Sequence, residues 1–447
     1  MFGILLPTFW IAPVSLALPR NNLRIVIHEG VAISSDAPRL RYVESWLAIN
    51  PRDPRNLVAA AITGDGGGVA AYASTDGGKT WSRAMHGAGK ETIFDGLDPA
   101  VAFDPDGNAY LLSAGKALAV WKSADGGRTW GGRAVVPGAW DRPFIGVGRP
   151  RGGSLVRLVY VSGKIPITVV GHLASDVFAL STSTDGGSSF GFPRLILPDP
   201  VRELLNVPSD LAVTPEGAVV AALQLFPPQD IRTPLLSGRY STIVSTDGGR
   251  TFSEPRPISD FRCYGHGWEG KSLLGLGGGR LAFDASNGSS RGRLYFVWLD
   301  VVEGFFQVMA SGSADGGKTW SAPVQINDNG TQADQSNPAI AVDGNGVVGV
   351  SWNDRRGDPT GRCFQTYFAA SSDGGKTFSP NRRISDAKTC PIPAGADPVE
   401  SEYRFKNGGD TQGLVGLPAG GFHLAWINGA SGELQLWSSA VSVNVAE

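Results

Sequence analysis

Short runs of alternating apolar and polar residues extend along the whole chain, and turns rich in glycine, proline and aspartate separate them. The run Phe306–Ser311 is an example, and the turn-like phrase Ser313–Trp320 follows it almost at once. A period of two residues predicts β-strands with one face buried. Long patterns of helical period are absent, so we predict an all-β protein with many short strands and tight turns.

One phrase, Ser-x-Asp-Gly-Gly-x-Thr/Ser-Trp/Phe, occurs six times at intervals of about 50 to 70 residues. Asp-Gly favours a hairpin turn because glycine adopts the required positive φ at little cost. The carboxylate can accept the turn's own N–H groups, and the closing aromatic residue can anchor the returning strand. The six copies are Ser74–Trp81, Ser123–Trp130, Ser183–Phe190, Ser245–Phe252, Ser313–Trp320 and Ser371–Phe378.

A second phrase, a polar residue followed by an apolar strand and often by Asp-x-Asp-Gly or Gly, occurs seven times. Together the two phrases describe repeats of four strands, which is the composition of one blade of a β-propeller. The predicted blades begin near Tyr42, Asp95, Asp141, Asn206, Trp268, Ser336 and Asp410.

The blade count and the closure of the ring follow from the ends of the chain. The seventh repeat lacks the Asp-Gly-Gly phrase, and the strand-like segment Leu23–His28 has no blade of its own. We therefore predict four-stranded antiparallel blades, seven in number, with Leu23–His28 pairing into the last blade and removing two sheet edges. Six blades and one insertion is the alternative. Either way residues 19–447 form one domain.

The six-fold phrase resembles the Asp box, or BNR repeat, of the sialidase (neuraminidase) superfamily of β-propellers. The resemblance covers nearly the whole chain and implies the fold, in which the Asp box is a structural staple. It also implies a retaining exo-glycosidase that binds a sialic acid carboxylate through three arginines. In that family an aspartate protonates the leaving group, and a tyrosine activated by a glutamate attacks.

The starts of the inner strands face one mouth of the central channel of a propeller, so the candidate site lies there. Converging carboxylates raise one another's pKa and can supply a protonated acid beside an ionised base. The alternative is that these side chains cap the strands and plug the channel. The candidates are Glu44, Asp98, Arg142, Asp210, Asn337 and Asp410.

The loop Trp352–Asp358 is the most charged of the sixth repeat. Paired arginines beside an exposed Trp352 would suit a carboxylate and a stacked sugar ring, so Trp352, Asp354, Arg355 and Arg356 are predicted to bind substrate. An internal salt-bridge knot of Asp354, Arg355, Arg356 and Asp358 is the alternative.

Few catalytic residues carry over from the resemblance. Asp98 matches the acid by position, and Tyr264 with Glu269 is the preferred nucleophile pair, with Tyr403 and Glu402 as a second choice. A packed loop is the alternative for Arg262–Lys271. Arg142 and either Arg355 or Arg356 would supply two of the three arginines, with Arg404 a candidate third. The family's Arg-Ile-Pro phrase before the first blade is absent, which puts the carboxylate pocket in doubt.

Composition narrows the classes of partner that the protein can bind. The formal net charge of −2 offers no electrostatic case for nucleic acid or an anionic membrane surface. No His, Cys or carboxylate cluster has metal-ligand spacing, and no cofactor is implied.

Residues 1–18 are apolar and too short to span a membrane, so we predict a signal peptide and a secreted protein; a buried first strand is the alternative. Cys363–Cys390 is then the preferred disulfide, and three separate thiols including Cys263 the alternative.

Two functions remain open at this stage. The first is a secreted, sialidase-like exo-glycoside hydrolase that acts on terminal sugars, above all sialic acid, at the channel mouth. The second is a non-catalytic propeller that binds glycan or protein on the same face.

Overall fold

A computed structural model describes residues 23–64, 67–86, 90–91, 93–138, 140–149, 157–169, 172–196, 205–227, 229, 233–265, 278–330, 332–390 and 408–445. All the regular elements in these ranges are β-strands. None of the described residues forms a helix long and apolar enough to cross a membrane.

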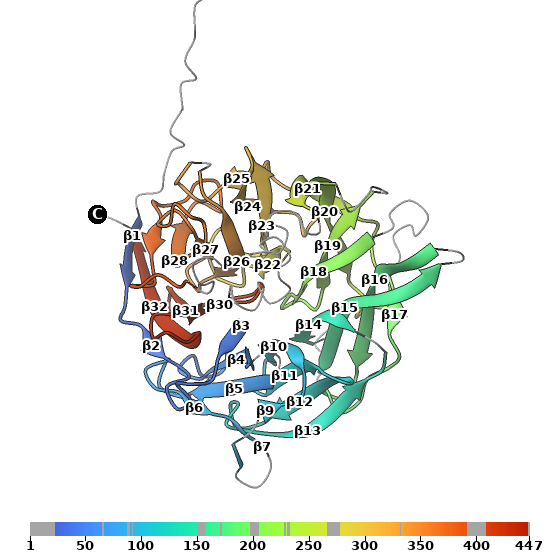
Figure 1. Ribbon diagram of the computed structural model, residues 1–447. Helices are drawn as coiled ribbons and strands as arrows, with labels where there is room; N and C mark the ends of the chain where they lie inside the picture. Colours follow the sequence, from blue (N-terminus) through green and yellow to red (C-terminus); the bar gives the residue numbers. More distant parts are fainter. Residues whose placement is uncertain are drawn as a thin grey trace, which may run out of the picture.

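The strands form seven antiparallel blades arranged in a ring (Figure 1), so the prediction of a seven-bladed propeller is confirmed. The first three blades are β3 (Tyr42–Ile49), β4 (Leu57–Thr63), β5 (Gly68–Ser74) and β6 (Ser82–Arg83); β10 (Leu97–Phe103), β11 (Ala109–Ala114), β12 (Leu118–Ser123) and β13 (Thr129–Val136); and β14 (Asp141–Gly148), β15 (Leu158–Val169), β16 (His172–Ser183) and β17 (Arg194–Leu195).

The next three blades follow the same order from the channel outward. They are β18 (Leu205–Val213), β19 (Val219–Phe226), β20 (Leu235–Ser245) and β21 (Arg256–Tyr264); β22 (Arg280–Phe283), β23 (Leu294–Val302), β24 (Phe305–Ser313) and β25 (Val324–Gln325); and β26 (Gln335–Val342), β27 (Val348–Asp354), β28 (Gln365–Ser371) and β29 (Arg382–Arg383). The fifth inner strand thus begins at Arg280, later than the predicted start near Trp268, which lies outside the described residues.

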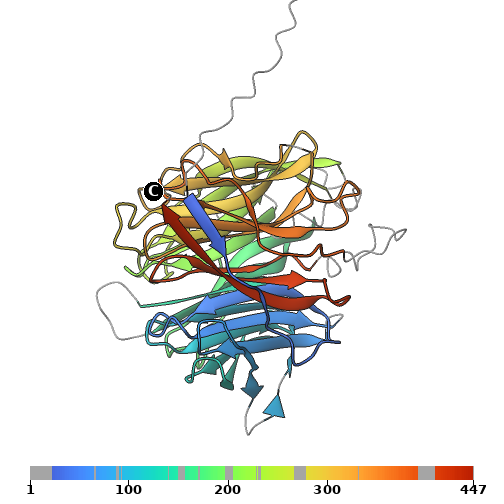
Figure 2. The same cartoon turned by 90° about the vertical axis from the view of Figure 1, so that its left-hand side faces the viewer.

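The two ends of the chain complete the seventh blade, as predicted. This blade contains β30 (Gly413–Gly416), β31 (Phe422–Asn428) and β32 (Gln435–Val445), and its outer strand is β1 (Leu23–Ile27), antiparallel to β32 with Leu23 opposite Val445. Figure 2 shows β1, in blue, along β32, in red. This pairing gives the outer edge of the last blade a partner and closes the ring.

Four short strands add to the rim of the ring. β2 pairs with β32, β9 pairs with β5, and β7 pairs in parallel with β13 and antiparallel with β8. Their bounds are Val31–Ala32 for β2, Met85–His86 for β7, Lys90–Glu91 for β8 and Ile93–Phe94 for β9.

All six Asp boxes lie between the third and fourth strands of their blades. In the copy after β24, the Asp315 carboxylate accepts the Lys318 and Thr319 amides at 3.0 and 2.9 Å and the Thr319 hydroxyl at 2.6 Å. The Ser313 hydroxyl donates to Asp315 and accepts the Gly317 amide. Each turn therefore closes on its own carboxylate, which is the structural role that the motif predicts.

The Asp boxes also contact the preceding blade. A Cβ built at Gly127 would lie 2.3 Å from Val58 of blade one, and one at Gly187 would lie 2.8 Å from Tyr110 of blade two. Only glycine fits these positions, because φ is +87° and +86° there and the neighbouring side chain fills the space. Each Asp box thus fixes its own turn and its contact with the preceding blade; we call this contact between neighbouring blades a seam.

A buried histidine occupies the corresponding seam between blades seven and one. His423 on β31 is 3% exposed, and a Cβ at Gly78 would lie 2.2 Å from its imidazole. Its Nε2 atom has no hydrogen-bond partner among the described residues. Burial lowers the pKa of His423 to about 4, so folding and protonation of this ring oppose each other.

We expect the free energy of unfolding to fall by about 3 kcal/mol as the pH drops from about 6.5 to 4. Above pH 6.5 the ring is neutral in both states; below it, the unfolded chain binds a proton that the folded chain excludes. Denaturant unfolding between pH 7.5 and 4 measures the slope. In His423→Val the histidine is replaced by valine, the residue found at the equivalent position of blade one (Val58). This variant should remove the dependence of the unfolding free energy on pH. An unchanged slope in this variant would place the acid sensitivity elsewhere.

Candidate functional site

Four non-glycine residues with left-handed backbone conformations lie at the same position of four inner strands. Glu44, Asp98, Arg142 and Asn337 have φ angles of +56°, +47°, +51° and +53°. At each of them the pairing of the first and second strands shifts register, as in a β-bulge. Residues other than glycine rarely adopt these φ angles, and such backbone strain persists where packing or function requires it.

Two of the four residues serve to hold the start of blade seven. Glu44 is 2% exposed, and its amide donates to the Gly408 carbonyl at 3.0 Å. Asn337 is 3% exposed, and its Nδ2 donates to the Gly409 carbonyl at 2.9 Å. These contacts favour the strand-capping role for Glu44 and Asn337 over a role in binding substrate.

The other two, Asp98 and Arg142, remain partly exposed. Arg142 Nη2 lies 3.3 Å from Asp410 Oδ2, and the two side chains are 17% and 5% exposed. Arg142 belongs to blade three, whereas Asp410 precedes the inner strand of blade seven, so this ion pair joins two blades that are not neighbours. The structure therefore brings Arg142 and Asp410 together at the channel, as predicted.

A buried arginine lies between two aromatic rings that come from the inner strands of other blades. The guanidinium carbon of Arg280 lies 5.4 Å from the ring centroid of Trp46 and 5.3 Å from that of Phe144. Its Nη1 donates to the Ser209 carbonyl at 3.0 Å, and its charge interacts with that of Asp210. Trp46, Phe144, Asp210 and Arg280 come from blades one, three, four and five, and we call them the channel plug.

Asp210 bridges blades four and five within this plug. Its two carboxylate oxygens accept the amides of Leu211 and Leu281, each at 2.8 Å, and the residue is 9% exposed. Burial raises the pKa of Asp210 and lowers the pKa of Arg280, while their opposite charges act against both shifts. Asp210 was predicted to bind substrate at a strand start; it is a buried group of the plug.

Sequence reasoning missed Trp46 and Arg280 as channel residues. Trp46 forms the first strand pair after its bulge, with Ala60, and Arg280 forms the first pair of its strand, with Val297. Phe144, opposite Ser162, and Asp210, opposite Ala222, take the same place in their blades. Alignment of the seven inner-strand phrases at this position would have identified the set.

The charged loop of blade six is held together by internal hydrogen bonds and ion pairs. Trp352 is 0% exposed, so its predicted role as an exposed sugar platform is wrong; its indole donates to Asp354 at 2.9 Å. Asp354 and Arg355 are each 1% exposed. Arg356 binds Asp354 at 2.7 Å and Asp328 at 2.6 Å. Trp352, Asp354 and Arg355 are therefore buried from substrate, and the guanidinium group of Arg356, whose side chain is 21% exposed, is held by two carboxylates.

Tyr264 lies on β21, the outermost strand of blade four, instead of at the channel. Its hydroxyl donates to the Gly304 carbonyl at 2.6 Å, and its ring packs on Phe306. This position does not suit a nucleophile at the channel mouth. Its predicted partner Glu269, and the alternatives Glu402, Tyr403 and Arg404, lie outside the described residues.

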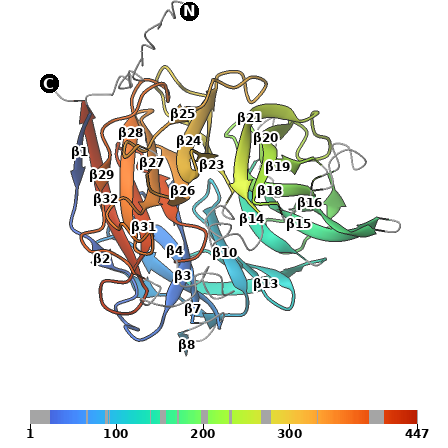
Figure 3. The same ribbon diagram turned by 45° about the horizontal axis from the view of Figure 1, so that its top comes forward.

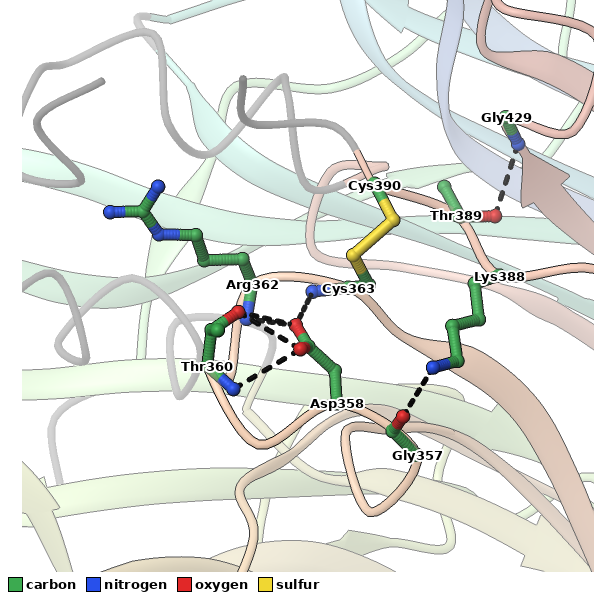
Figure 4. Close-up of a disulfide and its surroundings, with 9 residues drawn as sticks. All are labelled: Gly357, Asp358, Thr360, Arg362, Cys363, Lys388, Thr389, Cys390 and Gly429. Atoms are coloured by element: carbon green, nitrogen blue, oxygen red, sulfur yellow. Dashed lines mark hydrogen bonds between the residues drawn. A yellow bond between two sulfur atoms is a disulfide. The ribbon is translucent and has the colours of Figure 1, made fainter. Parts of the chain in front are cut away.

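The preferred disulfide, Cys363–Cys390, is present (Figure 4). It joins the loop before β28 to the stretch after β29. Asp358 orders this loop by accepting the amides of Arg362 and Cys363 at 2.8 and 2.7 Å, and the Gly429 amide donates to Thr389 Oγ1 at 3.0 Å. The disulfide thus fixes the loop of blade six beside blade seven.

No group of three or more His, Cys, Asp or Glu residues in the described ranges is arranged to hold a metal ion. The chemistry that these ranges place at the channel is that of carboxylates and guanidinium groups. Such groups can transfer protons and bind hydroxyl groups.

Comparison with known proteins agrees with the Asp-box turn. The model of the BNR/Asp-box repeat family matches residues 72–83, which span the first Asp box. None of the curated proteins matches the sequence.

Several solved structures are similar at low identity. A protein of unknown function from Dyadobacter fermentans has a TM-score of 0.49 at 14% identity, over 95% of this chain and 100% of that one. An α-L-arabinofuranosidase from Fusarium graminearum has a TM-score of 0.44 at 14% identity, over 93% and 97%. A leech intramolecular trans-sialidase has a TM-score of 0.42 at 12% identity, over 94% and 70%.

Proposed function

Because the chain is a seven-bladed propeller of BNR/Asp-box repeats, we propose that it is a glycoside hydrolase that cleaves a terminal, uncharged sugar at the channel mouth. Asp98 is the proposed general acid. The observation that carries this proposal is that two strained bulges hold the partly exposed side chains of Asp98 and Arg142 at the starts of neighbouring inner strands, with Arg142 paired to Asp410. Strain of this kind is common at active sites.

The charge at the channel favours an uncharged sugar. Among the described residues, the inner-strand candidates and the plug contribute the carboxylates of Glu44, Asp98, Asp210 and Asp410 and the cations Arg142 and Arg280. A sialic acid carboxylate would need an arginine triad, and both of these cations are already engaged, Arg142 by Asp410 and Arg280 by the plug. An uncharged sugar requires no such triad and can donate its hydroxyl groups to carboxylates.

Secretion is part of the same proposal. The Cys363–Cys390 disulfide supports an oxidising compartment outside the cytoplasm, where such bonds persist. Residues 1–18 would then be the signal peptide, and mass spectrometry of the mature N-terminus in the native host would test this.

The test of function is the release of fluorophore from aryl glycosides by the protein without residues 1–18. The panel contains an aryl sialoside and aryl glycosides of neutral pyranoses and furanoses, including an arabinofuranoside. We expect turnover of at least one neutral glycoside and none of the sialoside. Turnover of the sialoside alone would contradict the uncharged substrate. A folded sample that turns over no member of the panel would favour the second function, a non-catalytic propeller that binds glycan or protein.

A further inference from the structure

A pocket of about 520 Å³ lies between blades four and five, and none of its lining residues belongs to an inner strand. It lies along β20 and β21 and is closed by the end of β23. β21 and β23 are side by side in Figures 1 and 3, although they belong to different blades. The channel mouth and this pocket are therefore separate features.

Buried apolar residues form the floor of the pocket. Leu225 and Phe261 line it and are 4% and 3% exposed. Gly238 lines it as well, and a Cβ there would lie 2.6 Å from the Phe261 ring and 3.1 Å from that of Phe226. The absence of a side chain at Gly238 thus leaves room for these two rings.

Two acids and two arginines surround this floor. Arg239 Nε and Asp260 Oδ1 lie 2.6 Å apart, with their side chains 54% and 72% exposed. The backbone amide of Arg262 donates to Asp300 Oδ1 at 2.8 Å, so a carboxylate of blade five is fixed against the outer strand of blade four. Burial raises the pKa of Asp300, and the amide and charge of Arg262 act against that shift.

These four groups carry no net charge, so the rim favours neither an anion nor a cation. Their carboxylates accept hydrogen bonds and their guanidinium groups donate them, all around an apolar floor. A sugar ring has the matching pattern, since its hydroxyl groups both donate and accept and its C–H faces are apolar. The volume lies within the usual range of about 300 to 1,000 Å³ for small-molecule sites.

We propose that this pocket is a glycan-binding site that takes a neutral sugar unit, separate from the channel. Asp300 and Arg262 contact its hydroxyl groups, and Phe261 and Leu225 contact its apolar face. This site would hold a glycan on the protein whether or not the channel cleaves it, so the proposal is independent of the hydrolase activity.

The test is isothermal titration of the full chain with xylotriose, arabinotriose and sialyllactose. Ser237→Trp would fill the pocket from its exposed rim; the backbone of Ser237 pairs with Gln229, and that pairing does not need the serine side chain. Asp300→Asn removes the charge with little change in shape. Asp386→Asn, at an exposed position away from the pocket lining, is the matched control.

We expect a neutral trisaccharide to bind the wild type. Ser237→Trp should remove one binding site per chain, and Asp300→Asn should weaken that site at least tenfold. Asp386→Asn should bind as the wild type does, and Ser237→Trp should keep any hydrolysis of aryl glycosides. The proposal fails if no neutral trisaccharide binds at 10 mM, if sialyllactose alone binds, or if both pocket variants bind as the wild type does. Thermal unfolding of each variant establishes that it is folded.

Discussion

Asp98→Asn is expected to lower kcat/KM for a neutral aryl glycoside by about 10²- to 10⁴-fold, the usual contribution of a general acid. The asparagine keeps the size and the left-handed backbone tolerance of the aspartate, because Asn adopts positive φ more readily than most residues. The φ of +47° is therefore preserved, and the proton is what the variant lacks. Steady-state kinetics across pH 4 to 9 measures the effect, and the alkaline limb due to the acid should disappear.

The leaving group distinguishes an acid from a residue that only shapes the site. A glycoside with a strongly acidic phenol as leaving group needs little protonation, so its hydrolysis should fall much less in Asp98→Asn than that of a glycoside with a weakly acidic one. Asp386→Asn, the same change at an exposed position, should match the wild type. An equal loss for both leaving groups would assign Asp98 to positioning or folding and would remove it as the acid.

The sequence was sufficient for the fold because its two phrases act locally. The Asp box forms its turn from side chains within eight residues, such as Asp315 and Thr319, so its conformation does not depend on the rest of the chain. The unpaired strand Leu23–Ile27 and the missing Asp box of the last repeat pointed to the closure that the β1–β32 pair provides. Blade number follows from counting such local features.

The site was only partly predictable because its contacts cross the ring. Nothing in the local sequence indicates that Arg142 of blade three reaches Asp410, which precedes β30, or that Arg280 of blade five lies between Trp46 and Phe144. Exposure is equally non-local. Trp352 stands at the start of a run of polar residues typical of a surface loop, yet the packing between blades five and six buries it. Composition identified charged residues but not which of them are neutralised.

Arg280→Met is expected to lower the free energy of unfolding by about 3–5 kcal/mol, which is the usual cost of leaving a buried charge without its opposite charge. Methionine can retain much of the apolar contact with Trp46 and Phe144, so the loss comes mainly from the charge and from hydrogen bonds such as that to the Ser209 carbonyl. Asp210 then remains buried without this cation. Denaturant unfolding at pH 7, followed by tryptophan fluorescence, measures the change.

The pH dependence of this variant gives a second, independent readout. Burial already raises the pKa of Asp210, and loss of the Arg280 charge raises it further. A carboxyl group whose folded pKa exceeds its unfolded value of about 3.9 opposes folding at neutral pH and regains stability as the pH falls through the folded value. Arg280→Met should therefore be closer to the wild type at pH 5 than at pH 7. Asp210→Asn combined with Arg280→Met should recover part of the loss at pH 7, because it leaves no buried charge from the pair. A single variant that loses less than 1 kcal/mol, with no such pH trend, would mean that the plug is held by Trp46 and Phe144 alone and that the opposite charges of Asp210 and Arg280 are dispensable.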